Sequence, residues 1–236
     1  MRVLMPLPTF TARLELPDDV VVLEPPRLKP VARPSDAIAE ALAHPSGTPP
    51  LEEIARRTLA ERAQARAVVV VSDNTRPVPY RGEGGILWPV VERLLGAGFA
   101  AEQVTVVIAT GTHRRLSEIE IAELLDPRVA AAGVAVECHD AFDRSGLVPV
   151  GQTTAGLDVT MNRTYVQADL RILTGLVESH LMAGASGGRK SICPGLVGVD
   201  SVRDFHSARV LADPRACDLV IAGNPCHDLA LEIAAM

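Results

Sequence analysis

The chain has 236 residues, a length that fits one large α/β domain or two small ones. Its net charge of −6 argues against a nucleic-acid partner, and the low aromatic content of 3% argues against a platform that stacks bases or sugars. No apolar run reaches the roughly 18 residues of a membrane span, and the first ten residues lack the pattern of a secretion signal. The four cysteines show no CxxC spacing, so we expect reduced cysteines and a cytoplasmic protein.

The pattern of apolar residues predicts short strands that alternate with helices. Periodicity places strands, in chain order, at 12–16, 20–23, 67–71, 104–109, 134–137, 147–150, 157–161, 169–174 and 219–222. It places helices at 34–44, 51–63, 86–95, 117–125, 201–211 and 227–236. Strands alternating with helices of about ten residues predict the α/β class, as a doubly wound, mostly parallel Rossmann-like sheet with helices on both faces.

Local signals support the ends of several of these segments. Ser35 is expected to cap the first helix, and Ser117 with Glu120 has the spacing of a capping box. Prolines 25, 26 and 30 are expected to end the extended region near the start of the chain. The run AVVVV at 67–71 is too short for a buried helix and too uniform for a half-exposed strand, so we expect a central parallel strand.

Polar residues follow three of the expected strands, at the strand ends where open parallel sheets bind ligands. The three loops read SDNTRPVP at 72–79, TGTHR at 110–114 and GLVESH at 175–180. Histidine suits proton transfer near neutral pH, and His113 and His180 on separate loops can face a substrate from opposite sides, as a racemisation requires. The planar guanidinium group of Arg76 can bind a carboxylate or phosphate through two hydrogen bonds, and Asp73 adds a carboxylate at the same edge of the sheet.

A glycine-rich segment, MAGASGGRKSICPG at 182–195, carries Lys190. Only two of the 23 basic residues are lysines, at 29 and 190, so a lysine in such a turn favours a role for its amine. The segment is typical of a phosphate-binding turn but matches neither the Walker A register nor a dinucleotide fingerprint. An exposed lysine on a structural tight turn is the alternative interpretation.

The remaining histidines carry weaker signals. His206 lies in a predicted helix, where a lone histidine is most often structural, and His139 is expected to end a strand in a turn. His227 and His139 fit none of the spacings of protein zinc sites, so an all-protein zinc centre is not expected.

Several of these motifs, in order and at matching spacing, resemble the N-terminal domain of the nickel-pincer lactate racemase family. The resemblance is carried by SDNTRPVP, ATGTHR, ESHLMAGASGGRKSICPG, the later DFH and the final GNPCHD. It extends over nearly the whole chain and implies that residues 1–236 form the cofactor-binding, catalytic domain of a two-domain enzyme. We expect the family's second domain to lie outside these 236 residues.

The resemblance also implies a cofactor and a role for each site residue. The cofactor is a pyridinium-3,5-bisthiocarboxylic acid mononucleotide that carries nickel. Lys190 corresponds to the lysine that holds it covalently and His206 to the nickel ligand, while Asp73 and Arg76 correspond to the loop that organises the cofactor site. His113 and His180 correspond to the acid/base pair. One takes the hydroxyl proton of a 2-hydroxy acid while hydride passes to the cofactor, and the other reprotonates the oxygen.

The same resemblance implies an isomerase with a small 2-hydroxy acid as its substrate and the cofactor-synthesis proteins as partners. The net charge and the lack of a long apolar run predict no nucleic-acid and no membrane partner. The sequence departs from the family at Leu181, Met182 and Ala185, where aromatic residues are common, so we expect a pocket of different size. Two alternatives come from other classes. One is a non-catalytic module that only holds a cofactor or metal, and the other is an enzyme that forms a Schiff base through Lys190.

Overall fold

The computed structural model describes residues 1–7, 9–23 and 28–236, and the chain divides into two compact units, 1–32 and 33–236. In the first unit, strand β1 (Arg2–Pro6) pairs antiparallel with strand β2 (Thr11–Glu15). The strand expected at 12–16 is confirmed as one arm of this hairpin.

The strand expected at 20–23 is wrong, because that segment has exposed side chains and no strand geometry. Of the prolines expected to end the extended region, Pro25 and Pro26 lie outside the described residues.

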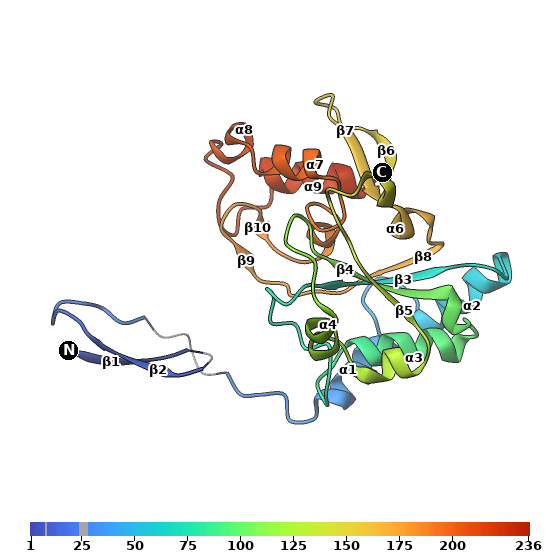
Figure 1. Ribbon diagram of the computed structural model, residues 1–236, viewed down its shortest axis with the longest axis horizontal. Helices are drawn as coiled ribbons and strands as arrows, with labels where there is room; N and C mark the ends of the chain where they lie inside the picture. Colours follow the sequence, from blue (N-terminus) through green and yellow to red (C-terminus); the bar gives the residue numbers. More distant parts are fainter. Residues whose placement is uncertain (8, 24–27) are drawn as a thin grey trace. The chain divides into compact units, whose positions relative to one another are not determined.

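The second unit is built on a four-stranded parallel sheet (Figure 1). Its strands, in spatial order, are β5 (Ala135–Cys138), β4 (Val104–Ala109), β3 (Ala67–Ser72) and β8 (Leu170–Leu173). The chain adds β4 and then β5 on one side of β3, and later places β8 on its other side. The direction of strand addition therefore reverses between β3 and β8, which is where open α/β sheets bind ligands beyond the strand ends.

Helices cover both faces of this sheet, as the doubly wound prediction requires (Figure 1). On one face lie α1 (Pro34–Ala43), α2 (Leu51–Glu61), α3 (Leu87–Ala97), α4 (Glu118–Leu124) and α5 (Pro127–Ala131). On the other lie α6 (Arg163–Gln167), α7 (Val199–Phe205), α8 (Ala208–Leu211) and α9 (Pro225–Ala234).

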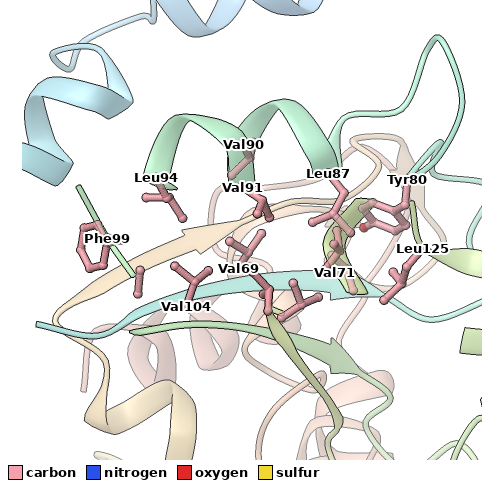
Figure 2. Packing of buried hydrophobic residues seen from close by; sticks show 14 of the residues in the cluster. Val69, Val71, Tyr80, Leu87, Val90, Val91, Leu94, Phe99, Val104 and Leu125 are labelled. Carbon is pink, nitrogen blue, oxygen red and sulfur yellow. The ribbon is translucent and has the colours of Figure 1, made fainter. Parts of the chain in front are cut away.

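Strand β3 contributes to a separate apolar core on each face of the sheet. Val69 and Val71 pack on the face where Leu87 and Leu94 of α3 point toward the strands (Figure 2). Val68 and Val70 belong to the second core, with α6, α7 and α9. Because side chains alternate between faces along a strand, a strand buried on both sides needs the uniform apolar run of 67–71.

Most expected helices form within a few residues of their predicted bounds. The capping box of α4 is present, because the Ser117 hydroxyl accepts a hydrogen bond from the backbone N–H of Glu120 and the Glu120 carboxylate accepts one from that of Ser117. The expected cap of α1 is wrong. Arg33 occupies the cap position, and the Ser35 hydroxyl donates to the Glu83 carbonyl at 2.8 Å instead.

Two predictions near the end of the chain are also wrong. The helix expected at 201–211 is divided into α7 and α8, with His206 at the end of α7 and Ser207 capping α8 through a hydrogen bond from the backbone N–H of Val210. The strand expected at 219–222 does not form. Leu219 has a φ of +59°, and its backbone N–H donates to the Gly184 carbonyl, so the chain turns here rather than extending.

Two antiparallel hairpins complete the second unit. Strands β6 (Leu147–Gln152) and β7 (Asp158–Asn162) confirm the strands expected at 147–150 and 157–161. Strands β9 (Ser179–His180) and β10 (Gly184–Ala185) form a short hairpin that the sequence did not predict. All four cysteines are free, but only Cys193 and Cys226 are fully buried. Among the described residues, no helix combines the length and apolar character needed to cross a membrane.

Candidate active site

A pocket of about 180 Å³ opens at the carboxyl ends of β3, β4 and β8. The loops that follow these strands form its walls, together with the 3₁₀ turn η3 (Gly188–Ser191) and the end of α7. It is lined by Ser72, Asp73, Thr75, Arg76, Ala109, Thr110, Gly111, Thr112, His113, Gly175, Leu176, His180, Ser186, Gly187, Lys190, Ser191, Pro194, Gly195, Val202 and His206. All six candidate site residues from the sequence are in this set, so the strand-end loops, η3 and the end of α7 bring them together.

Asp73 and His113 form a close pair across the ends of β3 and β4. The His113 Nδ1 atom lies 2.6 Å from Asp73 Oδ2, and the Asp73 side chain is only 4% exposed while that of His113 is 55% exposed. The other carboxylate oxygen, Oδ1, accepts hydrogen bonds from the backbone N–H and the hydroxyl of Thr75. Asp73 is thus fixed by its own loop and holds the His113 ring at the pocket wall.

His180 enters the pocket from the β9–β10 hairpin. Its Nδ1 atom lies 3.3 Å from the backbone nitrogens of Met182 and Ala183, which donate to it. Burial lowers the pKa of His180 to about 4, with the charges of Lys190 and Arg76 as the next causes. The ring is therefore neutral at physiological pH.

Lys190 reaches the pocket from η3. Its Nζ atom lies 5.7 Å from the centre of the Phe205 ring, and no carboxylate forms an ion pair with it within the described parts of the chain. Burial, followed by the positive charges of Arg76 and Arg189, lowers the pKa of Lys190 to about 8. A half-buried amine without a counter-ion is easily deprotonated, which is the state that attacks an electrophilic carbon.

His206 lies at the end of α7, on the same side of the pocket as Lys190. Its Nδ1 atom donates to the Val202 carbonyl at 2.8 Å, which leaves Nε2 as the ring nitrogen available to a ligand. The ring contacts Phe205 edge to face, with centroids 4.9 Å apart. The sequence predicts His206 inside a helix, whereas in the structure it directly follows the last residue of α7 and is exposed.

The loops after β4 and η3 approach each other very closely. The Gly111 backbone N–H donates to the Gly195 carbonyl at 3.0 Å, and Gly111 has a φ of +55°. A Cβ at Gly111 would lie only 3.1 Å from the Pro194 carbonyl oxygen, which shows how near the two segments are. These contacts fix the His113 loop against the turn that carries Lys190.

Sequence reasoning missed Tyr80, which holds two strand ends beside the pocket. The buried Tyr80 hydroxyl accepts a hydrogen bond from the Ser72 N–H at 2.7 Å and lies 3.2 Å from the Thr174 hydroxyl. Its one available signal was its rarity, because the chain has only two tyrosines.

The departures from the family pattern lie outside the pocket wall. Leu181 is 78% exposed, Met182 is buried in the second core, and neither these residues nor Ala185 line the pocket. The expectation that these three positions change the size of the pocket therefore stays a prediction.

The other histidines have structural surroundings. His139 follows β5 and is 2% exposed, with Nε2 donating to the Val197 carbonyl at 3.1 Å. Burial lowers the pKa of His139, and it also lowers that of His227. Within the described residues, no three His, Cys, Asp or Glu side chains gather in a group that could hold a metal.

Taken together, the pocket can move protons, bind an anion and present one nucleophilic amine. Two imidazoles on separate loops can exchange protons with a ligand, and Arg76 supplies a positive charge for a carboxylate or phosphate. Lys190 can form a covalent bond, and His206 offers one nitrogen donor close to it.

Comparison with known proteins shows which family the chain matches. Residues 9–218 match the lactate racemase N-terminal domain family. Lactate racemase of Lactiplantibacillus plantarum is 32% identical over 192 residues, which are 81% of this chain and 43% of that protein. Lactate racemase of Thermoanaerobacterium thermosaccharolyticum is 32% identical over 193 residues, which are 81% of this chain and 42% of that protein. The chain thus matches less than half the length of these curated relatives.

Solved structures agree with the sequence matches. The lactate racemase apoprotein from Thermoanaerobacterium thermosaccharolyticum superposes with a TM-score of 0.79 at 27% identity, covering 100% of this chain and 53% of that one. A Thermotoga maritima protein, 20% identical with a TM-score of 0.60, shares the fold over 78% of this chain and 46% of its own. The match over residues 9–218 and the agreement in structure show that the chain belongs to the lactate racemase N-terminal domain family.

Proposed function

We propose that the chain is the cofactor-holding, catalytic part of a racemase or epimerase that acts on 2-hydroxy acids, with lactate as the default substrate. The observation that carries the proposal is the placement of His113, His180, Lys190 and His206 around one pocket. An acid/base pair is of no use to a protein that only stores a cofactor, so this arrangement favours an enzyme over a non-catalytic binding module.

The pocket suits a covalently held nickel-pincer nucleotide. Lys190 presents an amine without a carboxylate partner among the described residues, and its lowered pKa favours the nucleophilic form. His206 has its Nδ1 occupied by the Val202 carbonyl and its Nε2 free, and neutral imidazole is a good nickel donor. A site with one histidine donor fits a metal whose other ligands come with the cofactor. When bound, this cofactor supplies a reversible acceptor for the hydride on the substrate's Cα.

The residues of the chain then bind an anionic group and transfer the protons of the substrate hydroxyl. Arg76 pairs with an anionic group, either the substrate carboxylate or the nucleotide phosphate. His113 takes or returns the hydroxyl proton on one side of the substrate, and Asp73 stabilises the charged ring. His180 serves the oxygen on the opposite side. The partner half that the longer relatives possess completes the enclosure of the substrate, and the proteins that synthesise the cofactor are the expected partners of the chain.

A panel of 2-hydroxy acid enantiomers tests this proposal. The protein is loaded with cofactor and supplied with the second domain of its family. Chiral chromatography then measures the conversion of each enantiomer into the other. We expect racemisation of at least one small 2-hydroxy acid, and a loss on the order of 10²–10⁴-fold in the His113→Gln variant. If the loaded enzyme racemises none of the panel, the proposed function is wrong.

A Schiff-base enzyme is the second candidate, and the lowered pKa of Lys190 is the observation that favours it. Borohydride trapping distinguishes the two. Substrate carbon fixed to Lys190 without nickel supports the Schiff-base enzyme, whereas no adduct with any 2-keto acid supports the racemase.

A further inference from the structure

The two pocket histidines have opposite partners at the same ring atom. The Nδ1 atom of His113 faces a carboxylate oxygen of Asp73 at 2.6 Å. The Nδ1 atom of His180 faces two backbone N–H groups, those of Met182 and Ala183, at 3.3 Å each. In both rings, Nε2 has no hydrogen-bond partner within the described part of the chain.

These partners fix where each neutral ring carries its proton. A carboxylate oxygen only accepts hydrogen bonds, so Nδ1 of His113 must be the protonated nitrogen and Nε2 must hold the lone pair. A backbone N–H only donates, so Nδ1 of His180 must hold the lone pair and Nε2 must carry the proton. The two rings are thus in complementary tautomers.

The surroundings of both rings are rigid enough to keep this arrangement. Asp73 is nearly fully buried, and its second oxygen is occupied by Thr75, so the carboxylate cannot turn away without losing these bonds. The hairpin that carries His180 turns at 181–183, and Gly184 directly after the turn has a φ of +73° and lies so close to Val220 that a Cβ would meet its carbonyl oxygen at 2.0 Å.

We infer that the two histidines of the resting pocket have opposite hydrogen-bonding roles. His113 Nε2 is the acceptor for a substrate hydroxyl proton, and His180 Nε2–H is a hydrogen-bond donor. The inference rests on the proposed function for its substrate, a 2-hydroxy acid, but its structural content concerns this chain alone. It makes Asp73 and the backbone at 182–183 the positioning elements of the proton-transfer pair.

The proton balance of this arrangement is simple. The hydroxyl proton moves to the lone pair of His113 Nε2 and forms a new N–H bond, and the resulting positive ring lies against the Asp73 carboxylate. For His180 to accept a proton at Nε2, its own proton must first move to Nδ1, where two N–H groups oppose it. Taking the second role therefore requires the 180–183 turn to rearrange.

Nitrogen NMR on the chain without cofactor or substrate tests the inference. The protein is labelled with ¹⁵N-histidine and studied at pH 8 by two-bond ¹H–¹⁵N correlation, with His113→Gln and His180→Gln variants to assign the signals. We expect the Nδ1-protonated pattern for His113 and the Nε2-protonated pattern for His180. The same tautomer in both rings would overturn the inference.

Asp73→Ala isolates the positioning role. We expect His113 to lose its Nδ1-protonated pattern while the His180 pattern stays unchanged, because Asp73 contacts only the first ring. Asp36→Ala, which removes an exposed carboxylate on α1, is the matched control and should leave both patterns intact. A His113 pattern that is indifferent to Asp73→Ala contradicts the inference. The racemase proposal is tested separately by substrate turnover, so each can fail without the other.

Discussion

The Lys190 ammonium group lies 5.7 Å from the centre of the Phe205 ring, and Phe205 is followed directly by His206. The fully buried Phe205 ring thus lies beside both proposed groups: the amine that would anchor a cofactor and the imidazole that would bind its metal. Both groups face the pocket from elements that follow one another in the chain, η3 and α7. The proposed attachment and ligation groups therefore line the same pocket as the Asp73–His113 pair, which comes from the loops after β3 and β4.

The lowered pKa of Lys190 predicts unusual reactivity toward amine reagents. Because burial and nearby arginines bring its pKa to about 8, acylation of Lys190 should reach half its maximal rate near pH 8. Mass spectrometry of the labelled peptides measures this, with the exposed Lys29 as a reference in the same sample. Arg76→Gln should move the midpoint to higher pH, whereas Arg57→Gln on the surface of α2 should not. A midpoint for Lys190 above pH 10 contradicts the prediction.

The lowered pKa of His180 predicts a loss of stability in mild acid. The unfolded chain binds a proton at His180 near pH 6.5, but the folded chain does so only near pH 4. The free energy of unfolding therefore falls as the pH falls from 6.5 to 4, because the unfolded state takes up more protons in that window. Urea titrations at several pH values should show a smaller fall for His180→Gln than for the wild-type chain. Equal falls would contradict the stated burial effect.

His139 is predicted to be a structural residue. It donates to the Val197 carbonyl, and its own carbonyl accepts a hydrogen bond from the Thr110 hydroxyl, so it ties the end of β5 to the loop after β4 and to the chain at Val197. His139→Leu leaves a buried carbonyl without its partner and should cost about 1–3 kcal/mol in the free energy of unfolding. His44→Leu, on an exposed helix end, is the control and should cost about 0.5 kcal/mol or less.

Tyr80→Phe tests how the strand ends are held. The variant removes the hydroxyl that accepts from the Ser72 N–H and leaves that buried donor unpaired, which should cost about 1–3 kcal/mol. Because Ser72 directly precedes Asp73, we also expect the NMR signals of the 72–76 loop to shift. Unchanged stability and an unchanged spectrum would mean that the hydroxyl does not position this loop.

Much of this architecture could be predicted because its signals are local. The run at 67–71 is apolar throughout because β3 is buried on both faces, and the polar loops after β3, β4 and β8 meet because parallel strands end at one edge. The capping box at Ser117 depends on residues three apart, so it was also readable.

The errors arose where long-range contacts or unusual backbone geometry decide the structure. The apolar residues at 219–222 suggest a strand, but the left-handed conformation of Leu219 and its contact with Gly184 prevent one. The pairing of Asp73 with His113 joins residues 40 positions apart, and no sequence pattern reveals it. The division of the helix at His206 had a readable signal, because Ser207 is a good cap for the following turn.

The proposed metal ligand can be separated from the proposed attachment site. His206→Ala should keep the covalent cofactor mass but lose bound nickel, because alanine offers no donor. His113→Gln should retain both mass and nickel. Elemental analysis of the loaded variants measures this, and full nickel occupancy in His206→Ala together with its loss in His113→Gln would mean that the two roles are exchanged.

The intact mass of the protein expressed together with the cofactor-synthesis proteins shows whether Lys190 carries the cofactor. We expect a mass increment that matches the pincer nucleotide, located on Lys190 by peptide fragmentation. The increment should be absent in Lys190→Arg and present in Lys29→Arg, which changes the other lysine of the chain. An unmodified Lys190 in protein expressed with a working cofactor supply, or an increment that persists in Lys190→Arg, would mean that Lys190 is not the attachment site.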